Sequence, residues 1–471
     1  MKNIFFQEKY IFFLICFFGI FLRYYNHSFD DLWYDEVISF YIANPEFSFQ
    51  ETLKQNNLID INIATYHFLL KFIFTFFGYT VENGRLFSVI LSSLSIFTVS
   101  YLSWIISRNK SYLFTSFLLS LNIFLISYSQ ELRVYSTLFF FSSLSLILFL
   151  KILKKSEFTF ALYVLYFFIS LILVALHPFA IIIFLSYLLY LILHFFKHKK
   201  KDIHLIASNL IILILASLIF FRSFKLAAGV GGANDYFWMT NPDLKFFTNF
   251  YFSSFFGSRL LGLIFLFVFI FLIATNLKKI KNLEIIVLLL SIIFLSYFLP
   301  IVFGIIFEPV LVSRYIIFVL IPINLVIAVL AFEIKNKFKI ILISLLVILT
   351  FGNHFTEQTF KQFFQDRIVS KPEYTAAMKF IEKSGNKNYI LKVTKMKNEQ
   401  ATVNALNNYI KYLNKKNNFD LKFWPSNKIS VKTWHICFQD FNGKDCKIEN
   451  VKNFNVLETK NFNNIELKLI E

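Results

Sequence analysis

Residues 30–41 read DDLWYDEVISFY, and the placement of this stretch decides how the rest of the chain is interpreted. It directly follows a single apolar run near the N-terminus and mixes four carboxylates with aromatic residues. The surrounding segment, residues 23–83, holds eight Asp or Glu and three Lys or Arg. An acidic segment next to an apolar run belongs on one side of a membrane, and the remaining sequence indicates which side.

The composition is that of a membrane protein. The chain has 471 residues, of which 57% are hydrophobic and 16% charged, and its mean hydropathy is +0.61. This leaves too few polar residues to cover the surface of a water-soluble domain. The net charge of +18 does not indicate nucleic-acid binding, because most lysines lie in short clusters between apolar runs, where positive charge sets membrane orientation.

Eleven apolar runs have lengths near those of membrane-spanning helices. No small-residue cleavage site follows the first run, so we interpret it as an uncleaved span and not as a signal peptide. The predicted spans are residues 10–22, 84–106, 112–127, 134–150, 158–174, 178–196, 204–221, 260–277, 284–306, 315–332 and 338–354.

The basic clusters predict the orientation of these spans. Every second connection is short and rich in Lys and Arg, which places it in the cytoplasm together with the N-terminus. These connections are SRNK (107–110), KILKKSE (151–157), KHKKKDIH (197–204), LKKIKN (277–282) and EIKNKFK (333–339). The acidic segment 23–83 and everything after residue 354 are therefore predicted to lie outside.

Two further segments are predicted on the outer side. Residues 64–77 form an apolar run that is short and contains His67 and Lys71, so we expect an amphipathic helix on the membrane surface. Residues 355–471 alternate helix and strand patterns and predict a small α/β domain. Its 20 Lys or Arg against 12 Asp or Glu suit an anionic outer surface, although a structural lid is an equally good interpretation.

The cysteines of this tail are candidates for a disulfide. Cys437 and Cys446 bracket CFQDFNGKDC, whose Asn-Gly pair is a strong hairpin signal. Outside the cytoplasm, we expect a bond that closes this hairpin, whereas a reducing compartment would leave two free thiols.

The four carboxylates of the opening stretch are not equivalent. Asp30 and Asp31 suit a solvated loop or a helix cap. Asp35 and Glu36 lie between an aromatic pair and the apolar VISFY, and neighbours on a helix point about 100° apart, so one can face a cavity while the other braces the helix. A carboxylate at an apolar boundary can act as a general base. The spacing alone leaves catalysis and structural support equally open.

Four cationic candidates gather at predicted external ends of spans: Arg85, Arg133, His177 and Arg314. Each alone is typical of a structural interface residue. Together they would form a cationic pocket suited to a lipid-attached phosphate.

Several segments resemble bacterial polytopic glycosyltransferases of the GT-C superfamily, related to protein O-mannosyltransferases and to the aminoarabinose transferases of lipid A. The resemblance extends over about residues 10–385. The matching segments are LWYDEVISFYIA (32–43), YHFLLKFIFTFFG (66–78), GRLFSVILSSLSI (84–96), YSQELRVYSTLFFFSSLSL (128–146), HPF (177–179), SRYIIFVLIPIN (313–324) and KPEYTAAMKFIEK (371–383).

The resemblance implies a site and a reaction. An acid of the first external loop activates the acceptor, a role that falls on Asp35 with Glu36 beside it. The donor is a polyprenyl-phosphate sugar, and its phosphate is held by cations, here Arg133 and Arg314 and more loosely Arg85 and His177. The reaction is a direct, inverting displacement at the outer face of a bacterial inner membrane. The acceptor is lipopolysaccharide, another envelope glycan, a lipid or a protein.

The sequence departs from the family at one place. The usual Pro-Pro pair is replaced by Ile63-Ala64, and Asn62 stands where a second acid is often found, which leaves Asp60 as the secondary acidic candidate. No Asp-x-Asp motif or metal-ligand cluster occurs, so no cofactor is expected, although the superfamily includes metal-dependent members. The glycine-rich AAGVGGAND (227–235) suits a lid within the external loop 222–259.

Rival interpretations remain at this point. A lipid or sugar transporter, or a flippase, would explain the many spans but predicts ionisable residues inside them, whereas here charges collect at span ends. An O-antigen ligase or polymerase shares the donor class but usually carries its large loop late in the chain. A non-catalytic scaffold is the third alternative.

Overall fold

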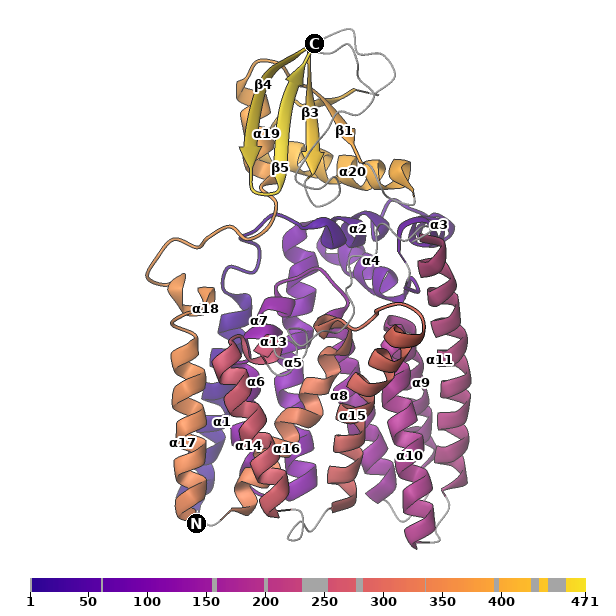
Figure 1. Cartoon of the computed structure of the whole chain (residues 1–471), viewed down its shortest axis with the longest axis vertical. Helices are drawn as coiled ribbons and strands as arrows, with labels where there is room; N and C mark the ends of the chain where they lie inside the picture. The colour runs from indigo at the N-terminus through magenta and orange to yellow at the C-terminus, as the bar shows by residue number, and fades with distance from the viewer. Residues whose placement is uncertain are drawn as a thin grey trace. The chain divides into compact units, whose positions relative to one another are not determined.

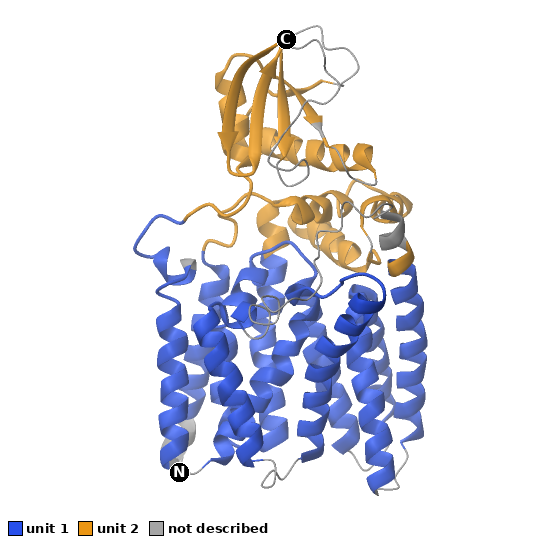
Figure 2. Cartoon of the chain, in the orientation of Figure 1, with its two compact units in different colours: residues 1–25, 86–223, 237–367 blue, residues 26–85, 224–236, 368–471 orange. Residues whose placement is uncertain are grey.

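The computed structural model describes residues 2–60, 62–154, 159–198, 202–230, 253–276, 283–334, 336–393, 398–424, 432–438 and 455–471. Contacts divide the chain into two compact units (Figure 2). Unit 1 contains Met1–Tyr25, Leu86–Ser223 and Phe237–Arg367, and unit 2 contains Asn26–Arg85, Phe224–Tyr236 and Ile368–Glu471. Each unit is described separately below.

Unit 1 is a helical bundle (Figure 1). Its helices are α1 (Lys2–Tyr24), α5 (Val81–Ser107, whose first residues belong to unit 2), α6 (Ser111–Ser120), α7 (Ile123–Ser129), α8 (Tyr135–Lys154), α9 (Phe160–Leu176), α10 (Ile181–His198), α11 (Ile203–Val230, whose last residues belong to unit 2), α13 (Ser253–Phe256), α14 (Arg259–Asn276), α15 (Leu283–Ile306), α16 (Leu320–Glu333), α17 (Asn336–Asn353) and α18 (Gln358–Lys361). Two 3₁₀ helices, η1 (Pro178–Ala180) and η2 (Ser313–Val319), precede α10 and α16.

Each of the eleven predicted spans overlaps one or more of these helices. Within the described residues, seven helices are long and apolar enough to cross a membrane, or eight if the bent pair α6 and α7 forms one span. The apolar helices indicate a multi-pass membrane protein. The count of eleven spans and the orientation remain predictions. The bend of 56° between α6 and α7 lies at Asn122, whose side chain accepts from the backbone N–H of Leu125 and so begins a new helix.

A buried arginine joins three helices of unit 1. Arg23, near the end of α1, donates to the carbonyl oxygens of Gly19, Leu119 and Ser120 and to Ser92 Oγ. These bonds satisfy a charged group that would be costly to bury alone. A Cβ at Gly19 would lie 2.5 Å from Ser120 Oγ, so the close approach of α1 and α6 requires glycine here.

The N-terminal part of unit 2 consists of three short helices, α2 (Tyr34–Ile42), α3 (Phe49–Ile59) and α4 (Thr65–Phe77). The helix expected at residues 64–77 is present as α4. It buries Tyr66, His67, Leu70 and Phe74 and exposes Phe72, Phe76 and Phe77. This two-sided pattern agrees with an amphipathic helix, and its place on a membrane surface remains a prediction.

The C-terminal part of unit 2 is an α/β fold, as the sequence predicted. Two helices, α19 (Tyr374–Lys383) and α20 (Glu399–Asn417), accompany a five-stranded sheet in the order β2-β1-β3-β5-β4. The strands are β1 (Asn388–Lys392), β2 (Lys422–Phe423), β3 (Thr433–Phe438), β4 (Val456–Phe462) and β5 (Ile465–Ile470). The pairs β1–β2 and β1–β3 are parallel, and β3–β5 and β4–β5 are antiparallel.

Two predictions, the disulfide of the tail and the glycine-rich lid, involve residues that the structure does not describe. Cys437 is buried in β3, but Cys446 lies outside the described residues, so their pairing remains a prediction. The lid segment 227–235 lies largely outside them as well. The predicted domain boundary at residue 354 also remains a prediction. The compact units divide the chain differently, because residues 26–85 group with residues 368–471.

Candidate functional site

Glu36 is the anchor of the acidic loop. It lies in the first turn of α2 and is completely buried. Arg85 Nε and Nη2 donate to its two carboxylate oxygens at 2.9 and 3.0 Å, and Lys371 Nζ lies 2.7 Å from Oε2. The backbone N–H of Trp33 donates to the same Oε2 at 3.3 Å. Glu36 therefore caps its own helix and is neutralised by cations from two distant segments.

All hydrogen-bond donors of the Arg85 guanidinium have acceptors within unit 2. Its Nη1 donates to the carbonyl oxygens of His27 and Asp30, and Nη2 donates to that of Asp31 as well as to Glu36. Together with the Nε bond, these five hydrogen bonds match the five N–H donors of a guanidinium. The loop before α2 therefore folds around the Arg85 side chain, which fixes the position where α2 begins. This geometry favours a structural role for Arg85 and for Glu36 over contact with a substrate.

The two aspartates before α2 bind the C-terminal tail. Asp30 accepts from the backbone N–H and the hydroxyl of Ser370, both at 3.2 Å, and is 5% exposed. Asp31 accepts from the backbone N–H and the hydroxyl of Thr375 at 2.7 and 2.8 Å, so it caps α19. The expectation of a solvated Asp30 is therefore wrong. Capping does occur, but at a helix that only the folded chain brings near.

Tyr409 of α20 strengthens this junction. Its hydroxyl donates to Asp31 Oδ1 at 3.2 Å and accepts from the backbone N–H of Leu32 at 3.1 Å. Burial raises the pKa of Tyr409 well above its usual range, and the negative charge of Asp31 adds to this increase. The hydroxyl therefore stays protonated and remains a donor.

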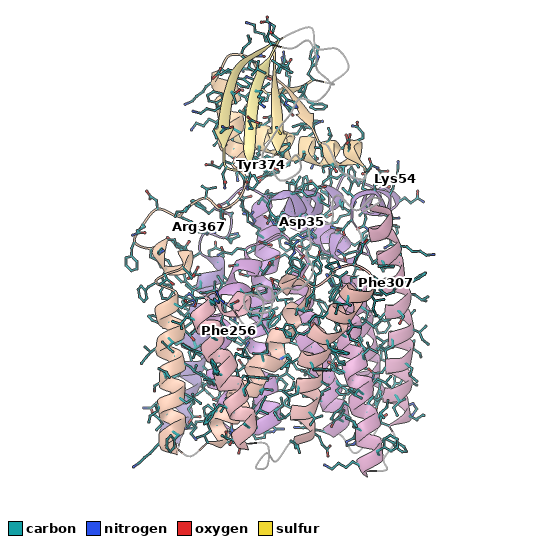
Figure 3. All side chains as sticks on the ribbon, in the orientation of Figure 1. Asp35, Lys54, Phe256, Phe307, Arg367 and Tyr374 are labelled. Carbon is teal, nitrogen blue, oxygen red and sulfur yellow. The ribbon has the colours of Figure 1, made fainter. Side chains whose placement is uncertain are left out.

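Asp35 lies beside this anchored frame. It is half-buried in the first turn of α2, one residue before Glu36 (Figure 3), and its carbonyl oxygen accepts from Ser39 Oγ at 3.0 Å. The neighbouring Tyr34 hydroxyl lies 3.3 Å from Thr402 Oγ1. Burial raises the pKa of Tyr34 to about 12, and the charges of Asp35 and Asp60 add to the increase. The charges of Asp35 and Asp60 therefore act on the pKa of Tyr34 in the same direction.

Asp60 follows α3 and is held by side chains on both of its oxygens. Oδ1 accepts from the backbone N–H and the side-chain amide of Asn62 at 2.9 and 3.0 Å, and Oδ2 lies 3.7 Å from His67 Nε2. His67 Nδ1 in turn lies 2.8 Å from Asn56 Oδ1. Asn62, the residue that replaces an expected acid, therefore orients Asp60.

Unit 1 brings three of the predicted cations together around two tyrosine rings. Arg133 lies with its guanidinium carbon 5.9 Å from the Tyr135 ring centre, and that of Arg314 lies 5.7 Å from the Tyr315 ring. The His177 ring centre is 5.1 Å from that of Tyr315 and 6.5 Å from that of Tyr135. We call Arg133, Tyr135, His177, Arg314 and Tyr315 the arginine–tyrosine cluster.

Local structure fixes the members of this cluster. His177 ends α9, and its Nδ1 accepts from the backbone N–H of Phe179 at 3.3 Å, which opens η1. Arg314 and Tyr315 lie in η2. Ahead of Arg133, Gln130 Nε2 donates to the carbonyl oxygens of Leu22, Arg23 and Tyr25. Gln130 thus binds the segment QELRVY (130–135) to the end of α1, and this fixes the positions of Arg133 and Tyr135 in the cluster.

The predicted site residues therefore fall into two groups. Asp35, Glu36, Asp60 and Arg85 belong to unit 2, whereas Arg133, His177 and Arg314 belong to unit 1. Sequence reasoning missed Lys371, although it begins the segment KPEYTAAMKFIEK, and it missed the two tyrosines. Tyr135 and Tyr315 follow their arginines closely, in VY and RY, and that spacing is a signal that could have pointed to them.

The chain has the fold of an archaeal oligosaccharyltransferase. The structure of the Archaeoglobus fulgidus enzyme tethered to an acceptor peptide with an NVT sequon is similar, with a TM-score of 0.54 and 11% identity over 92% of this chain and 69% of that chain. The same enzyme, AglB, in complex with an inhibitory peptide and a dolichol-phosphate gives a TM-score of 0.51, 11% identity and coverage of 92% and 69%. Its complex with Zn and sulfate gives 0.50, 12%, 91% and 68%.

This likeness shows a shared fold, while membership of the GT-C superfamily and of the bacterial families named from the sequence remains a prediction. No protein-family model matches the chain, and no curated protein matches it.

The described residues do not fit a metal centre. Over the described ranges, no group of three or more His, Cys, Asp and Glu is arranged to hold an ion. Histidine and acid do meet as pairs, Asp60 with His67 at 3.7 Å and Glu284 with His194 at 3.1 Å. No step through a metal is derived for this chain.

Proposed function

We propose that the chain is a membrane glycosyltransferase. It moves a sugar from a polyprenyl-phosphate-linked donor to a hydroxyl, or a phosphate, of a cell-envelope glycan, lipid or protein. The shared fold supports this proposal, because the similar enzyme is an oligosaccharyltransferase whose structures include a dolichol-phosphate and an acceptor peptide. Polyprenyl and dolichyl phosphates share the same chemistry, a phosphate on an isoprenoid chain.

The observation that carries the proposal is the contrast between two adjacent acids on α2. Glu36 is completely buried and bonded to Arg85, Lys371 and the backbone of Trp33. Asp35 is half-buried and sits on a turn that these bonds hold still. A carboxylate held in a fixed place is what a general base needs, since a small displacement of the reacting groups is costly.

The reaction follows from these parts. Asp35 accepts the proton of the acceptor hydroxyl as its oxygen attacks the anomeric carbon of the donor sugar. The bond between that carbon and the phosphate oxygen breaks, and the polyprenyl phosphate leaves with both electrons. Arg133 and Arg314 stabilise the negative charge that develops on the departing phosphate, and His177, whose Nδ1 accepts from the backbone N–H of Phe179, adds a donor through its Nε2–H. A single displacement inverts the anomeric configuration.

Arg85 and Glu36 take no direct part in this scheme, and Asp60 is the reserve candidate for the base. The two aromatic rings of the arginine–tyrosine cluster orient the guanidinium groups by cation–π contact.

A panel of donors tests the proposal. Membranes that contain the wild-type chain are incubated with cell-envelope extract and either radiolabelled polyprenyl-phosphate sugars or radiolabelled nucleotide sugars, with membranes that lack the chain as the control. We expect transfer only from a polyprenyl-phosphate sugar, with an inverted linkage in the NMR spectrum of the product. Transfer from a nucleotide sugar, or retention of configuration, would contradict the proposal. Donor flux across vesicles without transfer would favour the transporter.

A further inference from the structure

A cavity lies in unit 1, and none of the candidate site residues described above lines it. It has a volume of about 700 Å³ and opens between the start of α1, the last turns of α5 and the turn that leads into α6. Helix α1 begins at this end of the bundle (Figure 1). The lysine pattern predicts that this end is cytoplasmic, because the turn is the SRNK cluster. The volume is in the range of small-molecule sites.

One end of the cavity is basic. Lys9, Arg108 and Lys110 line it together with a single acid, Glu8. Lys110 Nζ pairs with Glu8 Oε1 at 2.5 Å, and the lining holds three basic residues against this one acid. Lys151 of α8, outside the lining itself, lies over the Tyr101 ring with its Nζ 5.2 Å from the ring centre. The cavity therefore attracts an anion.

The arginine of this cavity is held in a defined position. Its guanidinium carbon lies 3.8 Å above the Trp104 ring, a cation–π contact that covers one face of the group and leaves its N–H edge to meet a ligand. The backbone of Arg108 has φ of +54°, a left-handed conformation that a non-glycine residue adopts at a cost. The next residue, Asn109, fixes the turn by accepting from Ser107 Oγ and from the backbone N–H of Ser111.

The rest of the lining is apolar. Phe12 and Phe97 pack edge to face with ring centres 6.0 Å apart, and Tyr101 and Trp104 are each more than one third exposed. Ser100 lines the same face of α5, is 1% exposed, and its hydroxyl has no hydrogen-bond partner among the described residues. A buried hydroxyl without a partner costs free energy unless a ligand satisfies it. The cavity thus joins a basic rim to an apolar floor with one available hydroxyl.

We propose that this cavity binds an anionic phospholipid. Arg108, with Lys9 and Lys110, binds the phosphate of the headgroup. The hydroxyl of Ser100 donates to an ester oxygen, and the start of the acyl chains lies along Phe12 and Phe97. Basic pockets between spans at the cytoplasmic surface suit such headgroups, since that leaflet carries the anionic lipids. The site is separate from the proposed transfer reaction and does not depend on it.

Native mass spectrometry of the full chain, released from membranes of mixed lipids, tests this proposal. The wild type is expected to retain phosphatidylglycerol in preference to phosphatidylcholine. The Lys9→Gln/Arg108→Gln variant should retain about thirtyfold less, because each basic residue near an anionic leaflet is worth a factor of about five. The matched control, Lys337→Gln/Lys339→Gln, removes two charges from the same predicted side and should retain as much as the wild type. Equal losses in both variants, or equal retention of both lipids, would overturn the proposal.

Two further measurements keep the test decisive. A photoreactive phosphatidylglycerol should label wild-type peptides from the start of α1 and the end of α5, whether or not the variant folds, and labelling confined to other segments would overturn the proposal. Glycerol phosphate at millimolar concentration should not displace the lipid. Displacement at that concentration would identify the ligand as a soluble phosphate and not a lipid.

Discussion

The acidic loop of unit 2 and the arginine–tyrosine cluster of unit 1 differ in what surrounds their charged side chains. In the loop, Glu36 and Arg85 satisfy each other and their surroundings completely, with Lys371 as a second cation. In the cluster, Arg133 and Arg314 lie half-buried beside tyrosine rings. In the loop, the charged groups fix the backbone at the start of α2. In the cluster, the guanidinium groups lie beside tyrosine rings.

The difference teaches that span-end arginines of one sequence can have unlike roles. A guanidinium whose five donors are used inside the protein has none left for a substrate phosphate, so Arg85 acts as a brace. A guanidinium beside a ring is oriented through its face, and Arg133 and Arg314 share this arrangement. The following predictions test this contrast, from the largest expected effect to the smallest.

Removal of the buried acid should have the largest effect. The Glu36→Ala variant leaves the cations of Arg85 and Lys371 buried without their partner, and breaking a buried ion pair costs about 3–5 kcal/mol. The unfolding midpoint of the purified protein should fall strongly. The control Glu46→Ala, an exposed acid of the same loop, should leave it unchanged. An unchanged midpoint in Glu36→Ala would show that the pair does not brace the loop.

The cluster should respond in activity and not in stability. Arg133→Ala or Arg314→Ala should each slow transfer about 10²–10³-fold, the usual effect of removing one group that stabilises developing negative charge. The unfolding midpoint should stay within a degree or so of the wild type, since each side chain is only half-buried. Arg259→Ala, an exposed arginine at the start of α14, is the matched control. An equally large loss of transfer in the control would contradict a specific role of the cluster arginines in catalysis.

The junction between loop and tail should have a moderate effect. Asp31→Ala leaves the backbone N–H of Thr375 and the hydroxyl of Tyr409 without their acceptor, at a cost of about 1–3 kcal/mol. Limited proteolysis should then cut near residues 370–375 earlier than in the wild type. Proteolysis at the wild-type rate would mean that these bonds do not hold the tail.

A partly exposed ion pair should have the smallest effect. Lys416 Nζ lies 2.5 Å from Glu82 Oε1, but both side chains are more than one third exposed, so solvent weakens their attraction. Glu82→Gln should lower the free energy of unfolding by about 0.2–1 kcal/mol. A chemical-denaturation series with Glu46→Gln as the control measures this shift, and a loss above that range would mean that the pair is less screened than its exposure suggests.

Much of the fold follows from the sequence, because it depends on local signals. Apolar runs predict the helices of unit 1, and helix and strand patterns predict the tail from α19 to β3. The partners of single side chains depend on distant segments, which local patterns do not show. Asp31 is of a residue type that often caps helices, but the helix that it caps begins far away in the sequence, at Tyr374. The union of residues 26–85 with the tail is likewise visible only in the folded chain.

The candidate site was predictable in its residue types and less so in its roles. The pair of acids on α2 was expected to divide into a brace and a residue that faces a cavity, and the structure assigns the brace to Glu36 through Arg85 and Lys371. Arg85 could not be separated from Arg133 and Arg314 by sequence, since all three lie at predicted span ends. In the folded chain, Arg85 is marked by five hydrogen bonds within unit 2, and Arg133 and Arg314 are marked by their tyrosine rings.

The single-turnover rate of sugar transfer by the Asp35→Asn variant tests the central claim most directly. Asparagine keeps the shape of the side chain but cannot accept a proton, so the rate should fall about 10²–10⁴-fold while the unfolding midpoint stays that of the wild type. Glu46→Gln, which removes an exposed acid from the same loop, should transfer at the wild-type rate. Transfer by Asp35→Asn at the wild-type rate would contradict the account and move the base to Asp60.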